Sequence, residues 1–302
     1  MPTGTDDSDN IIQPFVLDTS RFHGRLVRLG GAIDDIIGRH DYPDPVAAVL
    51  AESVALTSAL AAALKFDGVF NLQLSGDGPV KFLVSDVTNA GDLRGYVGLR
   101  GELPDAEAVD RSPIPHLFGN GYLSFTVDQG VHTERYQGIV DLHGATLQDC
   151  VHHYFQQSDQ FSAAVKLYGG RDANGRWRAG AIMLQRSPET EDPNQQEPTE
   201  EAWRSALIML SSCTDRELID PDISAHNLLF RLFNEDGIRV FDPRSLRFAC
   251  RCSEGKVERV LKALSEAELA DLIVDDRVTV TCEFCNEERA YDRAQLALLR
   301  AS

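Results

Sequence analysis

Cys250-Arg-Cys252 and Cys282-Glu-Phe-Cys285 are the two stretches that decide how the C-terminal part of this chain folds. They hold four of the six cysteines, and residues 253–281 separate them. Structural zinc sites take four ligands at the corners of a tetrahedron, and thiolates from two turns of the chain can surround one ion. The spacing therefore predicts one zinc site formed by Cys250, Cys252, Cys282 and Cys285.

The same cysteines fit a second hypothesis, a thiol–disulfide oxidoreductase. Redox C-x-x-C motifs usually open a helix beside a βαβ pattern. Here Cys282 follows the strand-like run Val278-Thr-Val-Thr281, and the residues after Cys285 indicate a turn. This context favours a zinc knuckle. The tight C-x-C pair suits a local disulfide as well as a metal, so the spacing leaves a structural zinc site and a redox-active one both open.

Composition bounds the function. The chain has 302 residues, 43% of them hydrophobic, which suffices for one large domain or two to three small ones. It carries 29 basic and 47 acidic residues, for a formal net charge of −18. Nucleic-acid binders need Lys and Arg to displace counterions from phosphate. We therefore expect no nucleic-acid partner.

The expected location is the cytoplasm. No segment approaches ~20 uninterrupted apolar residues, so no membrane span is predicted. Residues 1–10 are polar and acidic, unlike a signal peptide, and are expected to form a disordered tail. In a reducing cytosol, metal binding is favoured over a permanent disulfide. The sequence also lacks G-x-G-x-x-G, P-loop and G-x-S-x-G motifs, so we expect no enzyme activity.

Residues 11–186 are predicted to form an α+β domain around a large, mostly antiparallel sheet. An Ala-rich helix begins at Asp44-Pro45 and runs to Leu64, apolar on much of its circumference and therefore expected to be buried. A second helix is expected over 146–155, with Thr146 as N-cap. Alternating patterns and turn residues predict strands at 22–29, 69–74, 80–84, 95–97, 121–127, 135–140, 161–168 and 177–185.

Residues 187–246 are predicted to form an acidic, Pro-rich linker followed by a helical region. Positions 187–201 contain three prolines, six acidic residues and no Lys or Arg, as is typical of a linker. Short helices are expected over 202–210, after a capping box at Thr214, and from Ser224 to Phe233. The last carries Leu228, Leu229, Leu232 and Phe233, which form either ordinary core or a face that is covered conditionally.

Residues 247–302 are predicted to form a small cysteine-containing unit. Val257, Val260, Leu261 and Leu264 have helical spacing, and a capping box begins at Ser265. A final helix through Leu296, Leu298 and Leu299 is expected after Asp292. A unit of this size has a small core, and structural zinc can contribute ~10–16 kcal/mol to its folding.

The cysteine pattern resembles the Hsp33 family of redox-regulated chaperones. The likeness extends beyond the cysteines to several segments in the same order. These are Phe70-Asn-Leu-Gln-Leu-Ser-Gly-Asp-Gly-Pro79, Arg94-Gly-Tyr-Val97, Tyr136-Gln-Gly-Ile-Val140, His153-Tyr-Phe-Gln-Gln-Ser158, Leu229-Phe-Arg-Leu-Phe233 and Val280-Thr-Cys-Glu-Phe-Cys-Asn286. It covers nearly the whole chain outside the N-terminal tail.

The resemblance implies a function. It implies an α/β N-terminal domain, a helical linker region and a C-terminal zinc domain, with Cys250, Cys252, Cys282 and Cys285 binding one zinc when reduced. Oxidation would pair Cys250 with Cys252 and Cys282 with Cys285 and release the metal. Apolar surface, for which Leu228, Leu229, Leu232 and Phe233 are our candidates, would then hold unfolding client proteins without nucleotide, often with formation of a homodimer.

Cys150 and Cys213 lie outside the zinc pattern, and we expect them to be buried and unreactive.

Two alternatives stay open beside the redox-switched holdase: a thiol–disulfide oxidoreductase, and a structural zinc protein that binds one defined partner.

Overall fold

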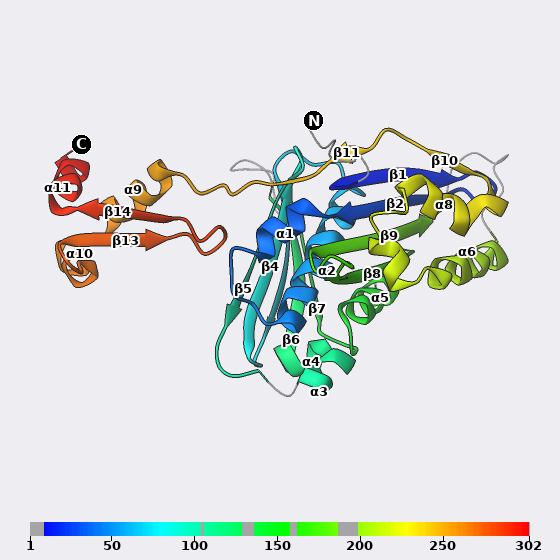
Figure 1. Ribbon diagram of the computed structural model, residues 1–302, viewed down its shortest axis with the longest axis horizontal. Coiled ribbons are helices and arrows are strands. Elements are labelled where there is room, and N and C mark those ends of the chain that lie inside the picture. Colours follow the sequence, from blue (N-terminus) through cyan, green and yellow to red (C-terminus); the bar gives the residue numbers. More distant parts are fainter. Residues whose placement is uncertain (1–8, 104–105, 129–135, 158–161, 187–198, 302) are drawn as a thin grey trace. The chain divides into compact units, whose positions relative to one another are not determined.

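The computed structural model divides into two compact units, Met1–Phe248 and Ala249–Ser302 (Figure 1). It describes residues 9–103, 106–128, 136–157, 162–186 and 199–301, and everything below refers to these residues. Residues 1–8 of the predicted tail and most of the acidic linker, residues 187–198, lie outside them. The prediction of a disordered tail is wrong for its last two residues, because Asp9 pairs with Arg178 and Asn10 accepts hydrogen bonds from Gly30 N and Ala32 N. The first unit includes the helices of the predicted linker region, while the three-part division of the chain stays a prediction.

The strands of the first unit are β1 Ile11–Leu17, β2 Phe22–Leu29, β3 Val69–Gly76, β4 Val80–Thr88, β5 Asp92–Leu99, β6 Gly121–Asp128, β7 Tyr136–Asp141, β8 Ala163–Arg171, β9 Trp177–Arg186, β10 Ile238–Val240, β11 Arg244–Ser245 and β12 Arg247–Phe248. Its helices are α1 Gly31–Ile37, α2 Asp44–Ala61, α3 Ala106–Arg111, α4 Pro113–Phe118, α5 Leu147–Gln157, α6 Glu200–Ser212, α7 Asp215–Ile219 and α8 Ala225–Phe233, with a 3₁₀ turn at Asn234–Asp236.

The strands of this unit form two six-stranded sheets, and the α+β class with antiparallel pairing is confirmed. Sheet A has the order β10-β1-β2-β9-β8, with β11 also pairing with β1. Sheet B has the order β12-β5-β4-β3-β6-β7, in which the β12–β5 pair alone is parallel. We expected a single large sheet, and the division into two follows from long-range pairings, such as β2 with β9, that local patterns do not encode.

Helix α2 forms the centre of the larger core. It contacts strands of both sheets, and Leu50, Val54 and Leu56 are fully buried. By length and composition α2 could cross a membrane, but 78% of its 18 residues are buried inside the protein. This is the burial of a core helix, because an amphipathic surface helix would leave one face in water.

A second core lies between sheet A and helices α6, α7 and α8. Phe15, Phe22 and Leu26 from the sheet pack against Leu228 and Phe233 of α8. Rings of Phe15 and Phe233 stack with centroids 5.8 Å apart. The two expected helix starts are confirmed, since the Thr214 capping box is complete and Ser224 accepts a hydrogen bond from the backbone of Asn227.

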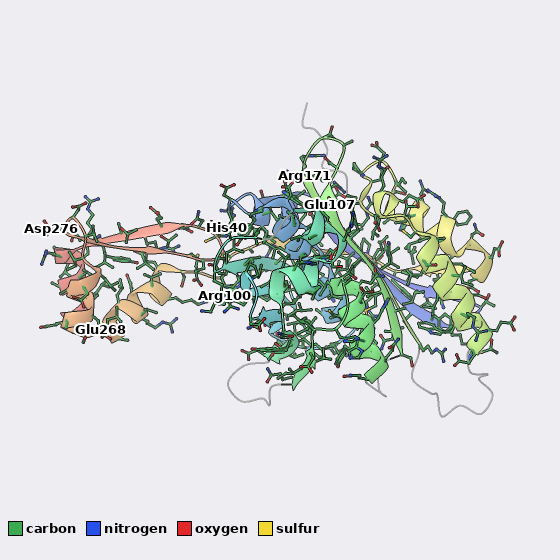
Figure 2. The ribbon with its side chains drawn as sticks, turned by 90° about the horizontal axis from the view of Figure 1, so that it is seen from below. His40, Arg100, Glu107, Arg171, Glu268 and Asp276 are labelled. Carbon is green, nitrogen blue, oxygen red and sulfur yellow. The ribbon has the colours of Figure 1, made fainter. Side chains whose placement is uncertain are left out.

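The second unit contains α9 Glu254–Ala263, α10 Glu266–Leu272, β13 Arg277–Thr281, β14 Glu288–Asp292 and α11 Arg293–Ala301. Strands β13 and β14 form an antiparallel hairpin. The capping box predicted at Ser265 is confirmed, and Glu268, labelled in Figure 2, supplies its reciprocal carboxylate. The helices expected through Val260 and through Leu298 are both present, and these two side chains lie on the exposed sides of their helices, Val260 63% exposed and Leu298 71% exposed.

Candidate metal centre

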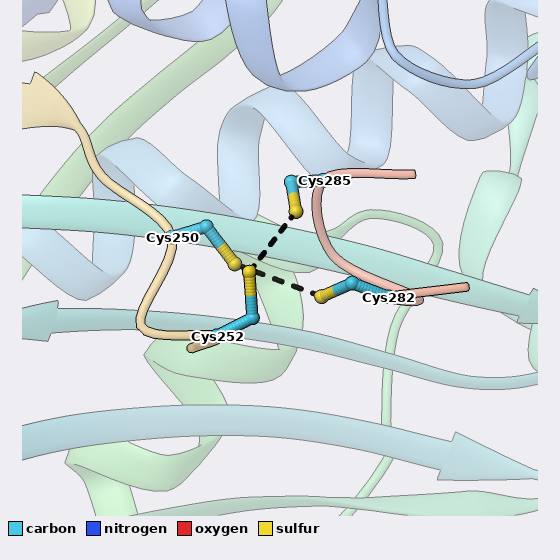
Figure 3. Close-up of side chains that lie close together, drawn as sticks. All are labelled: Cys250, Cys252, Cys282 and Cys285. Atoms are coloured by element: carbon cyan, nitrogen blue, oxygen red, sulfur yellow. Dashed lines mark hydrogen bonds between the residues drawn. The ribbon is translucent and has the colours of Figure 1, made fainter. Parts of the chain in front are cut away.

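The two cysteine pairs come together from separate segments of the second unit (Figure 3). Cys250 and Cys252 precede α9, whereas Cys282 and Cys285 lie in the turn between β13 and β14. That turn is closed by hydrogen bonds from Asn286 N to Cys282 O, 2.8 Å, and from Cys282 N to the carbonyl of Glu287, 3.0 Å. Asn286 adopts a positive φ of 56°, which asparagine tolerates better than most residues. The hairpin thus presents two thiols on one side of a tight knuckle.

The four sulfur atoms form a compact group. All lie within 4.8 Å of one another. The Cys250 and Cys282 sulfurs are 3.7 Å apart, and those of Cys252 and Cys285 are 3.5 Å apart. Four sulfurs at ~2.3 Å from a tetrahedral zinc ion would be separated by about 3.8 Å. The group therefore fits a metal ion, and all four cysteines are thiols rather than parts of disulfides.

The local environment pulls the thiol pKa values in opposite directions. Burial raises the pKa of Cys250 and that of Cys285. Burial acts the same way on Cys282, but hydrogen bonds from the backbone of Cys285 and Phe284 outweigh it and lower the Cys282 pKa. Four thiolates so close together repel one another, so a bound cation is the natural means of holding them all ionised.

The centre lies on a small core. Its described buried apolar side chains are Leu261, Leu269, Val278, Tyr291 and Leu296. Cys285 is buried, while Cys250, Cys252 and Cys282 are partly exposed. Such a core contributes little free energy of folding by itself. The three partly exposed cysteines can be reached by small oxidants from solvent.

Comparison with known proteins places the chain in a family. The model of the Hsp33 protein family matches residues 10–292. A 33 kDa chaperonin of Caulobacter vibrioides is 39% identical over 284 residues, covering 92% of this chain and 93% of its own length. The chain belongs to the Hsp33 family.

Other members agree with this assignment. A 33 kDa chaperonin of Pseudomonas fluorescens is 34% identical and covers 99% of this chain and 96% of its own length. The crystal structure of the Hsp33 homologue of Thermotoga maritima superposes with a TM-score of 0.81, at 21% identity, over 97% of this chain and 98% of that one. That structure supports the fold, and the sequence relatives support the chaperone family.

The two remaining cysteines of this Hsp33-family chain lie far from the centre in the sequence, and both are buried. Burial raises the pKa of Cys150 and of Cys213 to about 11. Cys213 also donates a hydrogen bond to the carbonyl of Thr214 at 3.7 Å. Both are therefore protonated at neutral pH, which makes them poor nucleophiles.

The candidate client-binding residues lie together on helix α8, which packs against sheet A. Leu228, Leu229 and Phe233 are fully buried in the second core, and Leu232 is half-buried at its border. Their neighbour Phe230 points outward and is 61% exposed. The face that these residues share with the sheet is hidden while α8 stays in place.

Two arginines that donate hydrogen bonds to carbonyls beside α7 and α8 were not predicted from the sequence. Arg28 of β2 is buried and donates from its guanidinium to the carbonyls of Asp220 and Ile223. Arg178 of β9 donates to the carbonyl of Ile219 at 2.6 Å. Arg28 has the same parity in the strand at 22–29 as the apolar residues Phe22 and Leu26, and this was the available signal, since an arginine on a buried face must find acceptors.

Proposed function

We propose that this chain is an ATP-independent holdase chaperone whose activity is switched on by oxidation. In the reduced state Cys250, Cys252, Cys282 and Cys285 hold one zinc ion, and the chaperone is inactive. Oxidation releases the metal and uncovers apolar surface, which binds unfolding proteins and prevents their aggregation. Membership of the chaperone family supports the activity, and the four-thiol group supports the switch.

One observation carries the proposal: four thiols within 4.8 Å of one another belong to a unit with a very small core. When bound, zinc supplies the free energy that folds such a unit. The four ligands are soft thiolates, which bind zinc in preference to magnesium or calcium. Loss of the thiolates therefore removes the metal and most of the stability of the unit together.

The redox step converts four thiolates into two disulfides. Cys250 joins Cys252 and Cys282 joins Cys285, in the pairing that the family resemblance implies. Two equivalents of hydrogen peroxide accept the four electrons and, with four protons, become four molecules of water. No thiolate then remains to bind the metal. All sulfur pairs are close in the reduced state, so the pairing rests on the family and not on the distances.

The second core supplies the surface for clients. Helices α6 to α8 cover Phe15, Phe22 and Leu26 of sheet A, and α8 is joined to Cys250 by residues 234–249 alone. The helices are short, and helices of this length depend on packing. We propose that they leave the sheet after oxidation, exposing the sheet face together with Leu228, Leu229, Leu232 and Phe233. The active form binds clients either as a monomer or as a homodimer. It acts in the cytoplasm, where resting thiols stay reduced.

Light scattering tests this function. A chemically unfolded client is diluted into buffer with the reduced, zinc-loaded protein or with protein treated with peroxide at raised temperature. Suppressed aggregation after oxidation alone supports the holdase; equal scattering in both samples, with zinc retained, supports a structural zinc protein. Cys252→Ser removes one ligand and should lose zinc while reduced, whereas Cys213→Ser lies outside the centre and should retain it.

A further inference from the structure

The segment 238–246, which we call the strap, runs along the outer edge of β1. Its first part, β10, pairs antiparallel with β1 from Phe15↔Val240 to Leu17↔Ile238. Its second part, β11, pairs Ile11 with Ser245 and Ile12 with Arg244. The register shifts by one residue between the two parts, so the strap bulges at positions 241–243. The edge of sheet A is thus covered by an interrupted strand of this same chain (Figure 1).

On this edge, the side chain of Gln13 is placed to bind the main chain of a neighbouring strand. Pro14 has no N–H, so at this position β1 lacks one donor toward the strap. The Phe241 N–H donates to the Pro14 carbonyl at 3.0 Å. The side-chain amide of Gln13 donates to the Phe241 carbonyl at 2.5 Å and so replaces the missing N–H. Gln13 is 1% exposed, which makes it a buried polar side chain aimed at the main chain of whatever strand lies on this edge.

The strap itself is weakly held. All its residues from Arg239 to Ser245 are exposed, and Phe241 is 48% exposed. Apolar anchors lie at the two ends: Ile238 packs on the second core and Leu246 is buried in the first. The Arg239–Asp18 ion pair is exposed on both sides and contributes little. Segments with few buried contacts open at low free-energy cost, and the strap ends four residues before Cys250.

We propose that the outer edge of β1 is a binding site for an extended segment of an unfolding polypeptide, which adds to sheet A as an antiparallel strand in place of the strap. This inference rests on the proposed function, and it names how part of the client is recognised. Strand addition reads main-chain hydrogen bonds and so accepts many sequences, as a chaperone requires. Side chains alternate across the new strand, so an apolar residue in the place of Ile238 would pack on the second core.

The edge is safe while the strap covers it. An unpaired apolar strand edge such as Ile-Ile-Gln-Pro-Phe-Val-Leu invites aggregation, and proline on the edge and a covering segment are two ways in which proteins prevent this. Both occur here. The strap therefore acts as a built-in competitor, and its release after oxidation makes the edge available to a client strand of similar shape.

Backbone-methylated peptides test the proposal on the wild-type chain. The probe is a fluorescent peptide of residues 237–246, added to the reduced, zinc-loaded protein and to the oxidised protein. Successive peptide groups of a strand point to opposite sides, so the Phe241 N–H faces β1 and the Val240 N–H faces away. We expect the peptide to bind after oxidation and to compete with a client. Methylation of the Phe241 nitrogen should weaken binding about tenfold, while methylation of the Val240 nitrogen should change it less than twofold.

A protein variant gives a second test. Gln13→Met keeps the length of the buried side chain but removes the amide donor, and it should weaken binding of the unmodified peptide several-fold without changing zinc content. Equal affinity of the two methylated peptides, or no peptide binding by an oxidised sample that protects clients, would overturn the edge site and leave the holdase intact. Failure of the oxidised protein to protect clients would instead overturn the proposed function.

Discussion

Gly180 of β9 lies directly beneath Leu218 of α7: a Cβ atom at position 180 would come within 2.6 Å of Leu218 Cγ. The helix therefore rests on bare backbone, and this contact is part of the interface between sheet A and the helices that cover it. Any side chain at position 180 must push α7 away from the sheet.

Gly180→Ala should activate the chaperone without oxidation. Overpacking of this kind costs roughly 1–3 kcal/mol, and here the strain falls on the docking of α7. We expect client protection by the reduced variant, with zinc still bound, in the light-scattering assay. Gly31→Ala is the matched control, because a Cβ there meets its nearest atom at 3.9 Å. A Gly180→Ala protein that folds, retains zinc and stays inactive until oxidised would contradict this role for the interface.

Arg28→Met should loosen the turn between α7 and α8. The substitution keeps an apolar stem but leaves the carbonyls of Asp220 and Ile223 without their donor. Hydrogen bonds to charged groups are worth about 1.5–3 kcal/mol, so we expect roughly 2–4 kcal/mol less protection of these helices. Hydrogen exchange of residues 200–233 measures this directly. Arg25→Met on the same strand, where the guanidinium bonds Gln185 within the sheet at 3.3 Å, should leave that exchange unchanged.

Glu52 of α2 should make the first unit less stable as the pH rises. Burial, with the negative charge of Asp215 added, raises the pKa of Glu52 from 4.5 to about 7. The folded state therefore holds its proton more tightly than the unfolded state, and this contribution is complete below pH 4.5 and is lost as the pH passes about 7. Glu52→Gln should abolish the dependence and gain roughly 1–3 kcal/mol at pH 8 over the wild type. Denaturant titrations at pH 5 and pH 8 measure it, and parallel curves for both proteins would show the assignment wrong.

The Asp215 charge couples this titration to α7. Asp215 forms an ion pair with Lys166 of β8, with 2.5 Å between nitrogen and oxygen. Ionised Glu52 repels the same carboxylate. The control for the preceding experiment is therefore Asp215→Asn, which should lower the pKa of Glu52 and weaken the pH dependence.

Metal removal should unfold the second unit while the core around α2 stays folded. A chelator applied to the reduced protein leaves a unit whose described core contains five buried apolar side chains, too few to fold without a staple. We expect loss of helical signal from α9, α10 and α11, restored by adding zinc, while hydrogen exchange in α2 stays slow. An apo form with all three helices still protected would show that the metal is not the source of stability.

The sequence anticipated those features that depend on neighbouring residues. The capping boxes at Thr214 and Ser265 are set by four consecutive residues, and the buried helix from Asp44 by its own composition. The four cysteines were assigned to one group from their spacing, and the structure brings their sulfurs together.

What the sequence left out depends on distant pairing. Strand β1 contains Pro14, which weakens a strand pattern, and its partners β10 and β11 are too short to show any pattern. The hydrogen bond from Arg28 to Ile223 joins residues 195 positions apart. The division of the strands into two sheets also depends on distant pairing, because each sheet contains neighbouring strands that are far apart in the chain.

The most direct test follows zinc release and client protection in one sample during peroxide treatment at raised temperature. The account predicts that protection develops at the same rate as zinc release or later, and that four thiols disappear as two disulfides, Cys250–Cys252 and Cys282–Cys285, by peptide mapping. Protection that precedes zinc release, or that appears in protein with its zinc and its four thiols intact, would contradict an oxidation switch built on this centre.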